Sequence, residues 1–362
     1  MRVLVMTVVH HPSDARISFR QIPALLAAGH SVTYAAPFTA RGTQPPDGVT
    51  PVDLPAATGR HRLAAIRSAR RAVKNLGATH DLVLLHDPDL LLAVRGQKLP
   101  PVVWDVHEDT MAALGMRDWL PQAVTPAART MVQRWQRWAD RHTRLLIAEA
   151  AYQSLFTQRA VVVPNTTLVP TEVTPPGAER VVYLGAVTKA RGAEELIGLA
   201  GQLPDGVTLH VVGPIAPEVA TDLNQASTQL PLVLHGFLPN DQALKLVDGA
   251  LAGVSLLHDE PNYRHSQPTK VIEYMAHGVP VISTPLPLAA GLITTAACGV
   301  LVPFGQQGPI EAALAIQTLR DNPTQRAKLG AAGHAAAQRD HDWASAGPKF
   351  VAALEAFVSP RS

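Results

Sequence analysis

Cysteine is nearly absent from this chain, because Cys298 is the only one among 362 residues. A single cysteine cannot form an internal disulfide, so the core must hold the fold, and a reducing compartment is expected. Aromatic residues make up only 5% of the chain, so aliphatic side chains must supply most of the packing. No run approaches the ~18 apolar residues that a membrane-spanning helix needs.

The sequence also lacks the usual signs of export and of nucleic-acid binding. The first apolar run, residues 3–9, leads into His10, His11 and Pro12 rather than into the small residues of a signal-peptide cleavage site. The formal net charge is only +2, and no basic nucleic-acid-binding motif is present. We therefore expect a cytoplasmic protein that does not bind nucleic acid. A peripheral contact with the inner face of the membrane stays open.

What the chain has is a large apolar content, 47% of its residues, arranged as alternating strands and helices. Short runs rich in valine and leucine predict strands, and amphipathic stretches between them predict helices. A proline-rich segment at residues 168–179 separates two such halves. The pattern predicts an α/β protein with two doubly wound, Rossmann-like domains facing across a cleft. We expect a first domain at 1–167, a second domain at 168–340, and a final helix at 341–362.

The loop after the first strand carries polar residues but no GxGxxG pattern, which argues against a nicotinamide or flavin enzyme. His11, Asp14 and Arg16 lie in this loop. Open α/β sheets bind ligands beyond the carboxyl ends of their strands, so these three are candidates for the acceptor side of a cleft. A loop held together by its own salt bridge is the alternative.

Two further polar clusters close predicted strands and so belong at the same edge of a parallel sheet. The first is His86 to Asp89, and the second is His107, Glu108 and Asp109. Asp87 and Asp109 also suit helix N-caps. A third possibility is a Mn²⁺ or Zn²⁺ site formed by His86, Asp87, Asp89, His107, Glu108 and Asp109. The chain has no HExxH pairing, and we expect no metal.

The most informative stretch runs from residue 261 to residue 284. A polar loop leads into a predicted helix at 270–277, which Gly278 ends in the left-handed conformation, and a buried strand follows. A helix start offers free N–H groups to a phosphate. Thr269 is expected as its N-cap, Lys270 adds a cation, and Glu273 could accept hydrogen bonds from a sugar diol. These features together suit a nucleotide diphosphate. The alternative is an ordinary capped helix with solvated side chains.

A second glycine-rich loop, GAVTKARG at residues 185–192, follows a predicted strand. Gly185 lets the backbone approach a ligand closely. Lys189 and Arg191 project from the junction between this strand and the next helix. A plain turn with solvated cations is the alternative.

Two predicted helices carry many cations. Residues 60–74 hold six arginines and lysines at mostly helical spacing, and residues 114–148 combine tryptophans with arginines. Such surfaces can face anionic lipid or an acceptor. More often they are solvated faces of helices that cover a core.

The 261–284 stretch resembles the signature of retaining, family-4-type glycosyltransferases with the GT-B fold. Weaker similarity covers 105–108, the VPN segment at 163–165, and 185–192. The resemblance implies that the first domain, 1–167, lies on the acceptor side and that the second domain, 168–340, binds the nucleotide sugar, with Glu273 on the ribose. It also implies that the final helix, 341–362, crosses back to the first domain. It also implies that His107 orients the transferred sugar, that Arg191 and Lys189 stabilise the leaving diphosphate, and that neither metal nor cofactor is needed. The donor-binding candidates are Gly185, Gly236, His265, Gln267, Thr269, Lys270 and Glu273. The acceptor-side candidates are His11, Asp14, Arg16, His86 and Glu108.

The chain departs from the family pattern at three positions. His265 stands where the family has the first of two glutamates, Ala186 stands where it has an arginine, and Arg191 stands where it has a lysine. The predicted reaction is transfer of a sugar from a nucleotide diphosphate sugar to a saccharide or lipid-linked hydroxyl, in polysaccharide or glycolipid synthesis. An epimerase acting on nucleotide sugars and a non-catalytic binding protein are the alternatives. The base, the sugar and the acceptor are left open.

Overall fold

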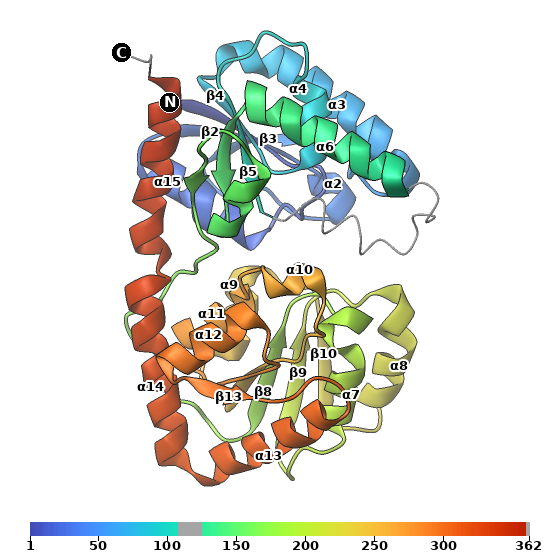
Figure 1. Ribbon diagram of the computed structural model, residues 1–362, viewed down its shortest axis with the longest axis vertical. Coiled ribbons are helices and arrows are strands. Elements are labelled where there is room, and N and C mark those ends of the chain that lie inside the picture. The colour runs from blue at the N-terminus through green and yellow to red at the C-terminus, as the bar shows by residue number, and fades with distance from the viewer. Residues whose placement is uncertain (108–124, 360–362) are drawn as a thin grey trace. The chain divides into compact units, whose positions relative to one another are not determined.

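The computed structural model describes residues 1–107 and 125–359 (Figure 1). The chain divides into two compact units. Unit 1 comprises Met1–Asn165 and Ser345–Ser362, and unit 2 comprises Thr166–Ala344. Each unit contains one sheet whose strands all run parallel.

The sheet of unit 1 has seven strands in the order β3-β2-β1-β4-β5-β6-β7. Because β2 and β4 lie on either side of β1, the strand order reverses next to β1, where doubly wound sheets place their ligands. The strands are β1 (Arg2–Met6), β2 (Ser31–Ala36), β3 (Val49–Asp53), β4 (Leu82–Leu85), β5 (Val102–Val106), β6 (Arg144–Ile147) and β7 (Val161–Val162).

Helices pack against this sheet, and α3, α4 and α6 share one apolar core with it (Figure 1). Leu4 and Met6 of β1 face that core, as do Ala69 of α3 and Ala139 of α6. The helices of unit 1 are a π-helical turn (Ile17–Gln21), α1 (Ile22–Ala27), α2 (Phe38–Arg41), α3 (Arg62–Leu76), α4 (Leu91–Val94), α6 (Thr125–His142) and most of α15 (Trp343–Val358).

The sheet of unit 2 has six strands in the order β10-β9-β8-β11-β12-β13. Its central strand β8 sends alternate side chains to opposite faces, as the period of two in a strand requires. Tyr183 faces one core and Leu184 faces the other. The strands are β8 (Arg180–Leu184), β9 (Thr208–Val212), β10 (Leu232–Gly236), β11 (Ala252–Ser255), β12 (Val281–Ser283) and β13 (Gly299–Leu301).

Helices cover both faces of this second sheet. Residues of α7, α8 and α13 pack on the Tyr183 face, whereas α9, α11, α12 and α14 pack on the Leu184 face. The helices are α7 (Ala193–Ala200), α8 (Pro217–Ser227), α9 (Asn240–Val247), α10 (Pro261–Arg264), α11 (Thr269–Ala276), α12 (Pro287–Ala296), α13 (Gln307–Asp321) and α14 (Pro323–Asp340).

Predictions that rest on local residue preferences, for a strand or for the end of a helix, are confirmed. The strand predicted at 102–106 is β5, and Gly278 follows α11 with φ +66°, as the predicted helix stop requires. Residues 15–27 are helical without a break, so Pro23 lies within a helix, shortly after the π-helical turn Ile17–Gln21. The predicted N-cap at Thr269 is wrong, because α11 begins at Thr269 itself and Pro268 occupies the cap position.

In the part of the chain that the structure describes, no helix combines the length and the apolar character needed to cross a bilayer.

Candidate functional site

In unit 2, the loop after β8 lies against the loop after β9, and two glycines make this contact possible. Gly213 has φ +146°, and a Cβ added there would lie 2.1 Å from the carbonyl oxygen of Gly185. Gly185 itself has φ +114° and donates its N–H to Val212 at 2.8 Å. No other residue type fits at Gly213 without moving backbone. The glycine pair therefore exposes bare backbone at the carboxyl end of the central strands.

Two cations converge on Gly185. A Cβ added at Gly185 would lie 3.7 Å from Nζ of Lys270 and 3.8 Å from Nη1 of Arg191. Lys270 comes from the first turn of α11, and Arg191 comes from the 3-10 turn Lys189–Arg191 that precedes α7. Residues 79 positions apart in sequence thus present positive charge to one glycine. Such an arrangement can bind a dianionic group.

The amine of Lys270 lies in an unusual environment for a lysine. Its Nζ is buried, has no hydrogen-bond partner among the described residues, and lies 3.6 Å from the centroid of the Tyr183 ring. Burial lowers the pKa of Lys270 well below its usual value, and Arg191 lowers it further, while Glu273 opposes both. An incoming anion would supply the partner that this amine lacks.

Glu273 lies one helical turn after Lys270 and is buried, with 6% of its surface exposed. Asn240, the first residue of α9, donates from Nδ2 to Oε1 of Glu273 at 3.0 Å. A buried carboxylate with an amide beside it is suited to hold a diol, because one group accepts hydrogen bonds and the other also donates them. Glu273 is therefore a buried, hydrogen-bonded carboxylate rather than part of a solvated helix face.

The remaining predicted donor residues of unit 2 are spread around this group. Gly236 ends β10 with φ +66° and accepts the N–H of Gly213 at 2.8 Å, so it supports the glycine contact. Gln267 and Thr269 are half-buried at the entrance to α11, whereas His265 is exposed. Lys189 points to solvent, with 70% of its side chain exposed, and pairs with Glu194 at 3.2 Å.

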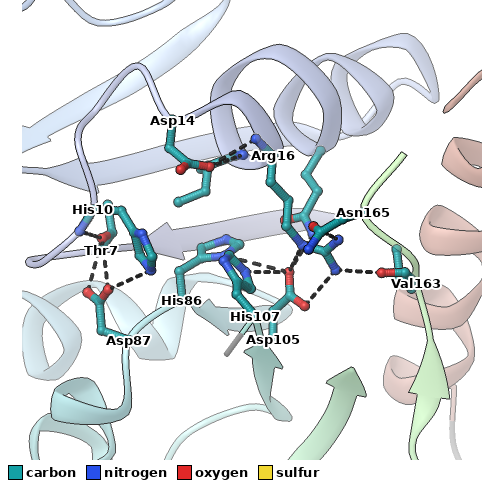
Figure 2. A network of polar contacts seen from close by, with 12 residues as sticks. Thr7, His10, Asp14, Arg16, His86, Asp87, Asp105, His107, Val163 and Asn165 are labelled. Atoms are coloured by element: carbon teal, nitrogen blue, oxygen red, sulfur yellow. Dashed lines mark hydrogen bonds and ion pairs between the residues drawn. The ribbon is translucent and has the colours of Figure 1, made fainter. Parts of the chain in front are cut away.

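In unit 1, Asp87 organises the loop after β1. Its carboxylate accepts the Thr7 hydroxyl at 3.0 Å and the N–H groups of Val8 and Val9 at 2.5 and 3.1 Å (Figure 2). His10 approaches the same carboxylate at 3.4 Å. Asp87 is also the residue before the short helix that leads into α4, but its side chain makes no cap hydrogen bond there. Its observed contacts thus fix the loop that carries the other polar residues.

A buried cluster joins that loop to the end of β5 (Figure 2). Arg16 donates to both oxygens of Asp105, from Nε to Oδ2 at 2.9 Å and from Nη2 to Oδ1 at 2.8 Å. His107 Nε2 lies 3.0 Å from the same Oδ2 and 3.1 Å from Nδ1 of His86. Burial alone would raise the pKa of Asp105, but Arg16 and His107 outweigh it and hold that pKa well below its usual range.

Three ligand atoms in this cluster, on His86, Asp105 and His107, lie within 4.8 Å of one another, as in a metal site. However, Oδ2 of Asp105 already accepts from Arg16, from Gln21 and from His107. A ligating histidine normally donates its other N–H to an acceptor, and Nε2 of His86 has none among the described residues. The contacts therefore fit a hydrogen-bonded cluster better than a cation site.

The other predicted acceptor-side residues have local partners. Oδ1 of Asp14 accepts the N–H groups of Arg16 and Ile17 at 2.9 and 3.1 Å, which starts the first helical segment. His11 is half-buried and accepts the N–H of Ser13 at 3.1 Å, and burial together with Arg41 lowers its pKa. Of the proposed metal ligands, Asp89 pairs with Arg62 at 3.3 Å. Glu108 and Asp109 lie outside the described residues.

The sequence did not predict several residues of these two sites, the one around Asp105 in unit 1 and the one around Lys270 in unit 2. Asp105 reads as part of an apolar strand, although its place two residues before His107 puts both side chains on one side of β5. Tyr183 likewise reads as strand core. Asn240 opens a helix and carries no signal that links it to Glu273.

Comparisons with known proteins agree with this architecture. A family model described as "Glycosyl transferase-like" matches residues 191–350, a range that includes Arg191, Lys270 and Glu273. The comparison with curated protein sequences found no match.

Solved structures match over almost the whole chain. Sucrose-phosphate synthase from Thermosynechococcus elongatus is 18% identical with a TM-score of 0.76, over 98% of both chains. Anabaena HepE in complex with UDP and glucose is 16% identical with a TM-score of 0.69, over 98% of this chain and 100% of that one. WaaG, a glycosyltransferase involved in lipopolysaccharide biosynthesis, is 14% identical with a TM-score of 0.69, over 98% and 99%. These likenesses identify the fold as GT-B, with two units that each contain a parallel sheet.

Proposed function

We propose that the protein is a retaining glycosyltransferase that moves a sugar from a nucleotide diphosphate sugar to an acceptor hydroxyl. The observation that carries the proposal is the convergence of Arg191 and Lys270 on Gly185, with buried Glu273 one turn further along α11. The two cations would hold the diphosphate and Glu273 would hold the ribose. The "Glycosyl transferase-like" match over residues 191–350 supports this reading, as do structural relatives solved with UDP or UDP-glucose.

The chemistry requires stabilisation of a leaving group. The bond between the anomeric carbon and the diphosphate oxygen breaks, and negative charge builds on the diphosphate. The acceptor oxygen forms its bond on the same face, and its proton passes to the departing phosphate oxygen. Arg191 and Lys270 would stabilise the charge without a metal, with preorganised contacts of this kind contributing about 3–4 kcal/mol each. His107, from unit 1, would orient the transferred sugar, and Lys189 remains a candidate third cation at the phosphates.

Turnover assays separate this function from its alternatives. The protein is incubated with UDP-glucose, UDP-N-acetylglucosamine and GDP-mannose, each with and without saccharide and lipid-linked acceptors. A transferase releases free nucleotide diphosphate and joins the sugar to the acceptor, and the anomeric proton coupling of the new glycoside, read by NMR, matches that of the donor. A changed sugar without acceptor indicates an epimerase. Binding without turnover indicates a non-catalytic protein. The departures from the family pattern at His265 and Ala186 would favour this outcome.

Glu273 provides a test of ribose binding. Glu273→Ala is expected to weaken UDP binding about 10- to 100-fold, because hydrogen bonds to a charged acceptor contribute about 1.5–3 kcal/mol. Isothermal calorimetry measures the affinity, and circular dichroism checks the fold. Glu218→Ala, on the exposed first turn of α8, is the matched control and should bind UDP as the parent does. Equal affinities for Glu273→Ala and the parent would remove Glu273 from the site.

We also propose that the protein is cytoplasmic and contacts an anionic membrane surface, where a glycolipid or polysaccharide acceptor would be presented. The support is a pocket between α4 and α6 that combines apolar and aromatic side chains with arginines. Met131 on its rim has 54% of its surface exposed. The lining residues are Leu91, Leu92, Arg95, Thr130, Met131, Arg134, Trp135 and Trp138. Helix α3 packs on the same face of the sheet, and its outer side carries exposed cations such as Arg67 and Arg71.

Vesicle sedimentation tests the membrane contact. Binding to phosphatidylglycerol vesicles should exceed binding to phosphatidylcholine vesicles and fall with salt, since each cation near such a surface contributes about 1 kcal/mol. The double variant Arg67→Glu and Arg71→Glu should lose about tenfold or more in vesicle affinity, whereas Lys328→Glu, on exposed α14 of unit 2, should not. Equal binding to both lipids would reject the contact.

A further inference from the structure

We propose that Asp105, held by Arg16, is a positioning residue that fixes the ring hydrogen of His107 on Nε2 and leaves Nδ1 as an acceptor for a ligand hydroxyl. Only the identity of the ligand rests on the proposed function. The hydrogen-bond geometry stands on its own.

The carboxylate decides where the hydrogen of His107 lies. Asp105 is fully buried and ionised between Arg16 and His107, so its oxygens can only accept hydrogen bonds. Nε2 of His107 lies 3.0 Å from Oδ2 of Asp105. Two lone pairs at that distance would repel each other, so Nε2 must carry the hydrogen. In neutral imidazole only one nitrogen does, and Nδ1 is then the acceptor.

His86 reinforces the same assignment. Its Nδ1 lies 3.1 Å from Nε2 of His107 and must accept, since the hydrogen of that contact already belongs to His107. Burial holds the pKa of His86 well below its usual value, so the ring is neutral and can accept. The N–H of His107 therefore has two acceptors on one side. Turning the ring over would lose both, which gives His107 one preferred orientation.

Arg16 holds the carboxylate with a two-point contact and is itself anchored at three places. Asp14 fixes its backbone N–H, while its remaining donors reach Val163 O at 2.8 Å and Asn165 Oδ1 at 3.0 Å (Figure 2). Asn165 is the last residue of the first segment of unit 1. Arg16 thus connects the start of the first helical segment, the end of β5 and the segment that follows β7.

The Nδ1 side of His107 is where a ligand would bind. The side chain of His107 is 10% exposed, and Nδ1 makes no hydrogen bond with the other residues that the structure describes. An acceptor nitrogen binds a donor hydrogen, such as that of a hydroxyl, and disfavours a carboxylate, which offers only lone pairs. The ligand must therefore present a donor hydrogen, and within the proposed function this is the hydroxyl of a sugar.

Nitrogen NMR of the full chain labelled with ¹⁵N-histidine tests the assignment without any activity. His107→Gln identifies the signal. The parent should show the Nε2–H form at His107, and an Nδ1–H form would overturn the proposal whether or not any variant folds. Asp105→Asn presents an amide that can donate, so the hydrogen should move to Nδ1. Asp81→Asn, an exposed aspartate before β4 paired with Arg2, should change nothing. An unchanged His107 signal in Asp105→Asn would equally overturn the proposal.

Kinetics separate positioning from simple destabilisation. Asp105→Asn should lower turnover of UDP-glucose about 10²-fold, the size expected when a contacting group is misplaced. Affinity for UDP, which lacks the sugar, should stay within about twofold because unit 2 would bind it. Parallel losses of both would overturn the role. If no nucleotide sugar is turned over by the parent, the proposed function fails, while the NMR result still decides the role of Asp105.

Discussion

Replacing Arg191 with alanine is expected to reduce turnover of the nucleotide sugar about 10²-fold or more while the protein stays folded. The guanidinium points at Gly185 beside Lys270, where the charge of the departing diphosphate would develop. Because this charge is larger in the transition state than in the bound donor, kcat should fall more than KM rises. Steady-state kinetics on UDP-glucose, or on whichever donor the turnover assays identify, measure both constants.

The fold should tolerate this change because backbone contacts fix the turn. The N–H of Arg191 is bound by the hydroxyl of Thr188 at 3.2 Å, and the next residue, Gly192, has φ +87° with backbone of Leu256 against it. These features do not involve the guanidinium. Arg191→Ala should therefore keep the melting temperature within a few degrees of the parent, since a surface change usually costs about 0.5 kcal/mol or less.

Two further variants sharpen the result. Arg191→Lys keeps the charge but loses the planar fork, so it should recover part of the turnover. Lys328→Ala, an exposed cation of α14, controls for the loss of one positive charge. Lys189→Ala then asks whether the solvent-facing lysine shares the role. Near-parent turnover in Arg191→Ala would remove the charge-stabilising role and, with it, the main support for the proposed mechanism.

The sequence predicted the fold class well because the relevant signals are local. A valine-rich run such as 102–106 is a strand wherever it is buried on both faces, and a glycine such as Gly278 can end a helix whatever lies nearby. Thr269 shows the limit at element ends. Thr269 suits an N-cap by its side chain, but it is the first residue inside α11, and Pro268 occupies the cap position.

The site was only partly predictable because its contacts join distant residues. Arg16 and Asp105 are 89 positions apart, and Asn240 and Glu273 are 33 apart. A strand residue that is buried can be apolar packing or the centre of an ion pair, and no local pattern distinguishes them. Arg16 was expected to face an acceptor, whereas its guanidinium is used within unit 1. Glycines that touch backbone to backbone, as Gly185 and Gly213 do, also depend on tertiary structure.

Lys270 yields the second large effect. Lys270→Met is expected to weaken donor binding about 10- to 100-fold, because it removes a charge-assisted hydrogen bond of about 1.5–3 kcal/mol. The same change should leave the ligand-free protein equally stable or more stable, since it removes a buried amine without a hydrogen-bond partner among the described residues. Calorimetry with UDP-glucose measures the first effect and thermal melting the second. Weaker donor binding together with a higher melting temperature would identify Lys270 as a binding residue, whereas a lower melting temperature would identify it as a structural one.

Proton uptake provides an independent measure of the same lysine. Burial and Arg191 hold the pKa of Lys270 well below its usual value in the free protein, and a bound diphosphate would raise it. Between these two pKa values, binding takes up a proton, so affinity falls as the pH rises from the lower one to the upper one. In the free protein the unfolded state binds the extra proton, so stability should rise with pH between the lowered pKa and about 10.4.

Calorimetry of UDP-glucose binding in buffers of different ionisation enthalpy measures this uptake. The donor is preferred to UDP because its diphosphate has no group that titrates near neutral pH, so any proton must bind to the protein. The parent should show uptake and Lys270→Met should show none. Lys245→Met, on the exposed side of α9, should behave as the parent does. Uptake that persists in Lys270→Met would place the titrating group elsewhere, and equal donor affinity in that variant would remove Lys270 from the phosphate site.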